Sequence, residues 1–305
     1  MSTDPRPGWM HAACLWEASA AKAGNVHPGA AFPDLDFTDF LRSADLLAEY
    51  YRALPEPWDS PGCVTRSLLE VARRVRDQVG KNTNLGILLL LAPLAAVPPT
   101  QTLRSGIGAV LESLSVEDTR RLYQAIRTLQ PGGLGRVEQQ DVDEEPTMPV
   151  RAVMALARDF DLIALQYANG FEDVLGFGLD RLDFWWRVAE GLGKLRIEQT
   201  VVGLHLDWMA EYPDSLIARK RGRALAEQAA LRSRQVLDAG WPRTRESKLL
   251  FEQLDQWLRE DGHSRNPGTS ADLVAATLFA GLREGIIGRT EVLPGVSRHT
   301  GEDDE

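Results

Sequence analysis

The chain has only two cysteines, Cys14 and Cys63, and they stand far apart in the sequence. Neither belongs to a close pair, so the sequence contains no zinc knuckle and no disulfide framework. The polar, proline-rich start MSTDPRPGWM also lacks the charged head and apolar stretch of a secretory signal. A reducing compartment fits this usage best, and we expect a cytoplasmic protein.

The chain also lacks a surplus of basic residues and a long apolar run. Its 34 basic and 44 acidic side chains give a net charge of −10, which opposes binding to a nucleic-acid backbone. A polyanionic ligand would therefore need a metal ion or a local basic pocket. The apolar run from Leu85 to Val97 is shorter than the ~20 residues of a membrane span and contains Pro93, so it predicts a buried helix. We expect no nucleic-acid partner and no membrane partner.

Strand-like alternation is almost absent, whereas apolar residues recur at helical spacing along most of the chain. With 305 residues, of which 44% are hydrophobic, the sequence can build a sizeable core. We predict one all-α, bundle-like domain over residues 1–305, with a loose tail at about 295–305. Helices are expected at 9–19, 36–51, 62–79 and 86–97, as two short helices within 100–129, and at 150–167, 183–210, 219–239, 246–260 and 270–284.

Three local patterns qualify this prediction. Ser115, followed by Asp118, indicates a capping box that begins a helix. Gly191 and Gly193 predict an interruption within 183–210. The segment 131–149 has no periodicity, and unstructured loops of this length are usually functional or disordered.

One histidine stands in strongly apolar surroundings. Leu204, Leu206, Trp208 and Met209 surround His205, so its helix face is expected to be buried and its ring needs a partner. Two interpretations follow: a hydrogen-bonded core histidine, or an acid/base group in a reaction.

Four short segments differ from ordinary helix-bundle composition because they gather glycine, asparagine, hydroxyl and charged residues at helix ends. Glycine lets a backbone approach a ligand closely, and a helix N-terminus offers free N–H groups to an anion. None of the segments matches a Walker loop or a dinucleotide fingerprint. The four segments are KAGNVHP (22–28), GKNTNLG (80–86), PDSLIARKRG (213–222) and NPGTSAD (266–272).

Taken together and in order, these segments resemble the triphosphoribosyl-dephospho-CoA synthase family. The resemblance begins at EASAAKAGNVHP and FPDLDFTDFLRSA, continues through NTNLG, GGLG and PDSLIARKRG, and ends at NPGTSADLVAATLF, its most specific motif. It covers about residues 10–285. The family's enzymes are all-helical and transfer the triphosphoribosyl group of ATP to dephospho-CoA with loss of adenine. The resemblance therefore implies an ATP-using transferase that acts on dephospho-CoA or a related, coenzyme-like acceptor.

The chain departs from the family's usual motifs at several positions. Ala21 and Ala23 stand where the family usually has prolines beside the lysine of the first segment. Asn84 and Leu85 stand where enzymes of known activity carry a His-Lys pair, which removes a cation. Arg136 follows the central glycines in place of an acidic residue.

The implied reaction requires particular charged and polar groups, and residues in the family motifs can supply them. Breaking the ribose–adenine bond creates positive charge at the sugar carbon, and the triphosphate must be neutralised by cations and Mg²⁺ held by carboxylates. The predicted metal ligands are Asp34, Asp214 and Asp272, and the predicted phosphate cations are Lys22, Arg219 and Lys220. Asn82, Thr83, Asn84 and Ser270 are predicted to orient ribose or phosphate oxygens, with Gly24, Asn25, Gly86 and Gly268 in the same nucleotide-binding set. Glu17 or His205 is predicted to take the proton of the acceptor hydroxyl.

Each of these residues also has a structural interpretation. Asp214 fits the cap of the helix that begins near Ser215, and Asp272 fits the favourable first turn of its helix. The lysines fit ordinary surface cations, Arg219 fits a side chain packed over apolar neighbours, and Glu17 fits a partner of a nearby cation. Two other functions remain open at this point: an ATP-dependent phosphotransferase or related step of coenzyme assembly, and a non-catalytic helical binding module.

Overall fold

Helices make up nearly all regular structure in residues 4–54, 57–131 and 139–288, the part of the chain that the computed structural model describes. In these ranges there are fourteen α-helices and no strands, which confirms the predicted all-α class. The first half holds α1 (Arg6–Ser19), α2 (Phe37–Ala53), α3 (Cys63–Gln78), α4 (Leu85–Ala96), α5 (Leu103–Ser113), α6 (Val116–Leu129) and α7 (Val150–Ala157). The second half holds α8 (Leu162–Asn169), α9 (Leu179–Val188), α10 (Arg196–Glu211), α11 (Ser215–Arg221), α12 (Arg223–Asp238), α13 (Arg245–Arg259) and α14 (Gly268–Arg283).

Local signals placed several helix ends correctly. At the start of α6 the Ser115 hydroxyl accepts from the N–H of Asp118, and the Asp118 carboxylate accepts from the N–H of Ser115. This is the predicted capping box. The interruption around Gly191 and Gly193 is confirmed as well, since a short 3₁₀ turn (Gly193–Leu195) separates α9 from α10.

Two predicted helices are each divided in the structure. The expected helix over 150–167 is α7 followed by α8, because the Asp161 carboxylate caps α8 by accepting from the N–H groups of Ile163 and Ala164. The expected helix over 219–239 contains a break at Gly222, whose φ of +91° ends α11 before α12 begins. A π-helical turn, Val174–Gly178, was not predicted either.

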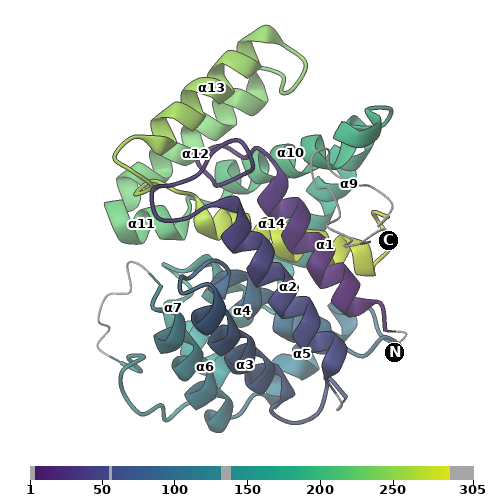
Figure 1. Cartoon of the computed structure of the whole chain (residues 1–305), viewed down its shortest axis with the longest axis vertical. Coiled ribbons are helices and arrows are strands. Elements are labelled where there is room, and N and C mark those ends of the chain that lie inside the picture. Colours follow the sequence, from purple (N-terminus) through teal and green to yellow (C-terminus); the bar gives the residue numbers. More distant parts are fainter. Residues whose placement is uncertain (1–3, 55–56, 132–138, 289–305) are drawn as a thin grey trace, which may run out of the picture.

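The central element is α14, which packs against α1, α4 and α10. Figure 1 shows it between α10–α13 on one side and α3–α7 on the other. Its residues from Leu273 to Leu282 are all buried, and so is almost every residue of α4, as predicted for the apolar run. Among the described residues, no helix has the length and apolarity to cross a membrane.

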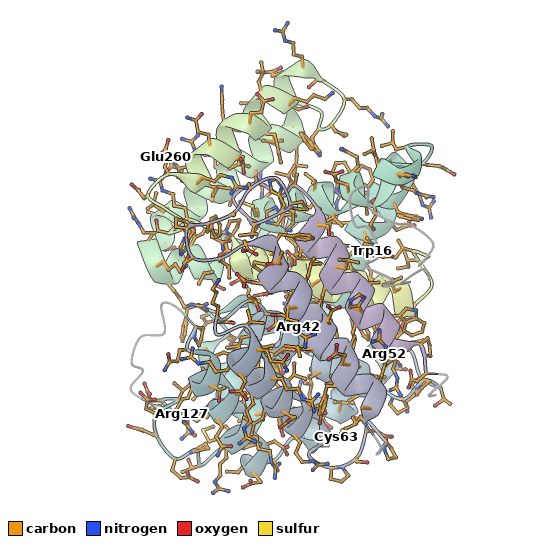
Figure 2. The ribbon with its side chains drawn as sticks, in the orientation of Figure 1. Trp16, Arg42, Arg52, Cys63, Arg127 and Glu260 are labelled. Atoms are coloured by element: carbon orange, nitrogen blue, oxygen red, sulfur yellow. The ribbon has the colours of Figure 1, made fainter. Side chains whose placement is uncertain are left out.

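The first two helices lie side by side across the molecule (Figure 1). On α2, Arg42 donates to Glu49 of the same helix and to Gln78 of α3, so it ties α2 to its neighbour (Figure 2). Trp16 on α1 is 3% exposed and belongs to the shared core (Figure 2). The segment 20–36 joins these helices and contains two isolated bridges, His27–Ala30 and Phe32–Leu35.

Some predictions fall outside the described residues. These are the GGLG motif, Arg136 and the expected loose tail at about 295–305. Within the described residues 139–149 there is no helix, in agreement with the predicted loop.

Candidate nucleotide-binding site

One cavity of about 860 Å³ receives residues from all four of the unusual segments. Its wall also includes parts of α1, α2, α4, α6, α7, α8, α11 and α14. Segments that are separated by up to 250 positions in the sequence therefore meet at one place. The predicted site residues on this wall are Glu17, Asn25, Asp34, Asn82, Thr83, Asn84, Gly86, Arg219, Lys220, Gly268 and Asp272.

Five predicted site residues are not on this wall: Lys22, Gly24, His205, Asp214 and Ser270. Gly24 has no side chain, and the other four residues are at most 1% exposed. Lys22, Gly24, Asp214 and Ser270 bond to other parts of the protein, so they hold the segments that line the cavity rather than facing it.

Lys22 and Glu17 form a buried ion pair at the end of α1. The Lys22 ammonium lies 2.9 Å from Glu17 Oε1 and also donates to the Glu17 carbonyl oxygen. Because both side chains are less than 6% exposed, the pair is shielded from water and from salt. Lys22 thus lies behind the wall and pairs with a carboxylate, that of Glu17, which lines the cavity.

Asp214 joins two of the four segments. Its Oδ1 accepts from the N–H groups of Leu216 and Ile217, which caps α11, and its Oδ2 accepts from the N–H and hydroxyl of Ser270 at 2.8 and 2.9 Å. Burial raises the pKa of this carboxyl, and the hydrogen bonds from Ile217 and Ser270, together with the charge of Arg219, oppose that effect. The geometry matches the capping interpretation of Asp214, extended by a clamp on the start of α14.

Asp272 lies in the first turns of α14 and faces the start of α4. A Cβ on Gly86 would come within 1.9 Å of Asp272 Oδ2 and within 2.8 Å of Ile163 Cδ1, so only glycine allows this close approach. Burial, followed by the neighbouring Glu17 carboxylate, raises the pKa of Asp272 well above its usual value. Two acidic groups, Glu17 and Asp272, therefore meet on one wall of the cavity.

Cationic side chains line another part of the wall. Lys220 on α11 is half-buried, and this burial lowers its pKa. Arg219 also lines the cavity and pairs with the Asp161 carboxylate. Lys81 is held 2.7 Å from Asp39. Sequence reasoning missed Lys81 and Asp161, although Lys81 belongs to the segment GKNTNLG and its position there was a usable signal.

The cavity continues along an apolar wall made by α6, α7 and α8. Leu156 is 44% exposed and Phe160 is 53% exposed, which is high for large apolar side chains. This wall was not predicted, because its residues have the ordinary spacing of amphipathic helices. Other apolar residues of the same wall are Leu122, Ile126, Leu129, Val153, Met154, Ala157, Ile163 and Ala164.

His205 lies inside the core. It is 0% exposed, and burial together with the nearby Lys22 charge lowers the pKa of its ring well below the usual value. The ring is therefore neutral near pH 7. Its burial favours a core histidine over an acid/base group, but neither ring nitrogen has a hydrogen-bond partner among the described residues, unlike the hydrogen-bonded histidine that was expected.

The described carboxylates, thiols and imidazoles do not form any group of three or more that would hold a metal ion. A metal at this cavity would need one or two carboxylates of the chain, with the remaining ligands from substrate and water.

The comparison with protein families decides what kind of enzyme has this cavity. A family profile described as ATP:dephospho-CoA triphosphoribosyl transferase matches residues 7–290. The chain belongs to this family. The ATP:dephospho-CoA triphosphoribosyl transferases use ATP and dephospho-CoA as substrates, so the chain is a transferase of coenzyme biosynthesis with ATP as a substrate. The resemblance found in the motifs is confirmed.

A solved structure supports the fold of this transferase. It is a crystal structure from Archaeoglobus fulgidus, of a protein described as a candidate triphosphoribosyl-dephospho-CoA synthase. The two chains are 21% identical, with a TM-score of 0.60, and the match covers 81% of this chain and 100% of the archaeal chain. At this identity the likeness concerns the fold alone. No curated protein matches this chain closely enough to add a relative.

Proposed function

We propose that the cavity binds ATP between the α11 cations and the carboxylates of Glu17 and Asp272, and transfers its triphosphoribosyl group to dephospho-CoA. The observation that carries the proposal is the meeting of four distant segments on one wall, with acidic and basic side chains on it. The family's reaction needs both: cations for the triphosphate, and negative charge beside the reacting sugar carbon.

The triphosphate is assigned to Lys220 and Arg219. Gly268 and Thr269 at the start of α14 lie on the same wall, so the dipole of this helix adds to the attraction for an anion, although the Ser270 N–H is already bonded to Asp214. On a chain with a net charge of −10, such a local concentration of donors and cations is what a polyphosphate requires.

The ribose is assigned to the neighbourhood of Asp272 and Glu17. When the bond to adenine breaks, positive charge develops at the sugar carbon, and a nearby carboxylate stabilises it as in glycoside cleavage. The close packing of Asp272 on Gly86 holds this carboxylate in place before substrate arrives. Preorganised charge of this kind costs no reorganisation during the reaction.

A magnesium ion fits the cavity if Asp272 is one of its ligands. Asp272 is buried next to another carboxylate, and a divalent cation would relieve both the burial and the repulsion. Asp34, which is also on the wall, is 70% exposed, whereas the Asp214 oxygens already accept four hydrogen bonds. Bound there, Mg²⁺ would supply charge neutralisation for the phosphate oxygens.

The acceptor is assigned to the apolar wall of α6–α8. Dephospho-CoA carries a long, uncharged arm beyond its nucleotide, and the apolar wall offers surface for such an arm. Of the two predicted bases, Glu17 lies on the cavity wall and His205 does not. We therefore assign to Glu17 the role of accepting the proton from the acceptor hydroxyl as the new glycosidic bond forms.

The test is a product analysis of ATP incubated with the protein, Mg²⁺ and dephospho-CoA. The proposal predicts free adenine together with a product that combines dephospho-CoA with the triphosphoribosyl group. ADP or AMP as the only nucleotide product, with no adenine, would instead select a phosphotransferase. A Glu17→Gln variant is expected to release far less adenine while it still binds ATP.

A further inference from the structure

Asn84 is a buried side chain whose hydrogen-bonding groups are unused in the described structure. It lines the cavity, it is 5% exposed, and neither its amide nitrogen nor its amide oxygen has a hydrogen-bond partner among the described residues. Leaving a buried polar group without a hydrogen bond is costly. In a substrate cavity, the substrate can supply the missing partner.

The position of Asn84 in α4 makes this more specific. It is the N-cap residue of α4, where an asparagine normally accepts a hydrogen bond from the first turn. Here its side chain makes no such bond, and Asn82 Oδ1 accepts from the Leu85 N–H at 3.1 Å instead. The neighbouring Thr83 hydroxyl pairs with Ser43. Of the three polar residues in NTN, only Asn84 keeps both of its groups free for a ligand.

The chemistry of the amide argues against a phosphate as the partner of Asn84. Two residues further along, Gly86 is packed against the Asp272 carboxyl group, so the surroundings of Asn84 are already acidic. A phosphate offers only acceptors, which would leave the amide oxygen of Asn84 unpaired. An uncharged group that presents one donor and one acceptor in a plane satisfies both demands.

The N6 and N7 edge of adenine has this pattern, and asparagine is its usual two-bond partner. The amide nitrogen of Asn84 would donate to N7, and its oxygen would accept from the N6 amino group. We propose that Asn84 reads the adenine base of a substrate through this edge. The inference rests on the proposed function, under which the base lies next to the ribose at Asp272. Because ATP and dephospho-CoA both contain adenine, the base of either substrate is a possible partner.

Two arms of one experiment distinguish these sources, with wild type compared to Asn84→Ala and to Asn84→Leu. In the first arm, calorimetry without acceptor measures Kd for Mg·ATP and for Mg·7-deaza-ATP, which lacks the N7 acceptor. Binding is the readout here, because the glycosidic bond of a 7-deazapurine is intrinsically harder to break. In the second arm, ATP is the donor throughout and kcat/KM is measured for two acceptors, dephospho-CoA and its 7-deazaadenine analogue. Kinetics can be used here because the bond to the acceptor's base is not broken in the reaction.

The wild type is expected to prefer the natural base by about tenfold or more in one arm, and both variants are expected to lose this preference. A preference in the first arm identifies the base of ATP, and one in the second arm identifies the base of the acceptor. Equal behaviour of natural and 7-deaza compounds in both arms, or a preference that persists in the variants, would overturn the proposal. If the alanine and leucine variants failed to fold, the isosteric Asn84→Asp would replace them, because its carboxylate cannot donate to N7 and should lose the preference. Absence of a preference in the wild type would overturn the proposal by itself.

Failure of the proposed function and failure of this inference would give different results. A preference for ATP over 7-deaza-ATP that the Asn84 variants lose, without any triphosphoribosyl product from the wild type, would support the role of Asn84 and contradict the assigned reaction. A wild type that forms the product without discriminating in either arm would support the reaction and contradict the role of Asn84.

Discussion

The carboxylate of Asp272 occupies the space that a side chain on Gly86 would need. The distance from an ideal Cβ on Gly86 to Asp272 Oδ2 is 1.9 Å, far below any real contact. A glycine of GKNTNLG and an acid of NPGTSAD are thus fitted to each other, although 186 positions separate them. This contact fixes the relative position of α4 and α14 at the cavity.

Replacing Gly86 by alanine should displace Asp272 and lower the transfer rate. The added methyl group overlaps the carboxylate and the Ile163 side chain, and such overpacking usually costs about 1–3 kcal/mol of stability. We expect a lower Tm and at least a tenfold loss of kcat, since a displacement of about 1 Å at a catalytic group can cost 100-fold. Gly108→Ala is the matched control, because nothing lies within 4 Å of its Cβ position and α5 should gain stability. Equal kinetics in the two variants would argue against a role for this contact.

Replacing Asp272 by asparagine should separate stability from activity. Burial and Glu17 disfavour ionisation of the Asp272 carboxyl in the folded state, and asparagine removes that cost, so the folded state should gain stability, with a Tm rise of about 2–4 °C for each kcal/mol. The negative charge beside the ribose is lost at the same time, so adenine release should fall by two orders of magnitude or more, about 3 kcal/mol of barrier. Thermal unfolding and adenine release are measured on the same sample. A stable variant with full activity would refute the assigned role.

Replacing Asp214 by alanine should mainly weaken the fold. Four donors lose their acceptor: the N–H groups of Leu216, Ile217 and Ser270, and the Ser270 hydroxyl. Loss of the cap costs about 0.5–2 kcal/mol and each buried unsatisfied donor adds to it, so we expect a loss of about 2–4 kcal/mol in denaturant unfolding. The Mg²⁺ concentration that gives half-maximal activity, measured below the Tm, should not change. A large rise in that concentration would support the predicted role of Asp214 as a metal ligand.

Stability should decline on acidification because of His205. Burial and Lys22 keep the folded-state pKa well below the unfolded value of 6.5, so below pH 6.5 the unfolded chain binds a proton that the folded chain does not. This group then removes about 1.4 kcal/mol of stability per pH unit until the folded-state pKa is reached. His205→Leu should flatten this decline in urea unfolding between pH 6 and pH 5, a window set by that lowered pKa. An unchanged slope would show that His205 is protonated in the folded protein.

The helices were largely predictable because their apolar residues recur at helical spacing over ten or more positions. The break between α7 and α8 was not, since Asp161 interrupts a pattern that continues through Phe160 and Ile163. An aspartate can cap the start of a new helix or lie on the solvent-exposed face of a continuous one, and the direction of the following chain determines which. That is decided by packing against the rest of the molecule.

The candidate site was predictable as a set of segments and much less as individual side chains. The family resemblance assigned the four motifs to one nucleotide-binding set, and the cavity contains residues of all four. The direction of each side chain depends on local competition for hydrogen bonds, which a sequence does not display. Asp214 turns toward Ser270 and the start of α11, whereas the Asn84 side chain makes no capping bond and Asn82 accepts from the Leu85 N–H in its place.

The central claim is that these four segments form the binding site for ATP. A crystal structure of the wild-type protein with Mg·ATP and no acceptor tests it most directly. The account predicts the triphosphate against Lys220 and Arg219 and the ribose beside Asp272. A nucleotide bound elsewhere on the molecule, with this cavity filled only by solvent, would contradict it.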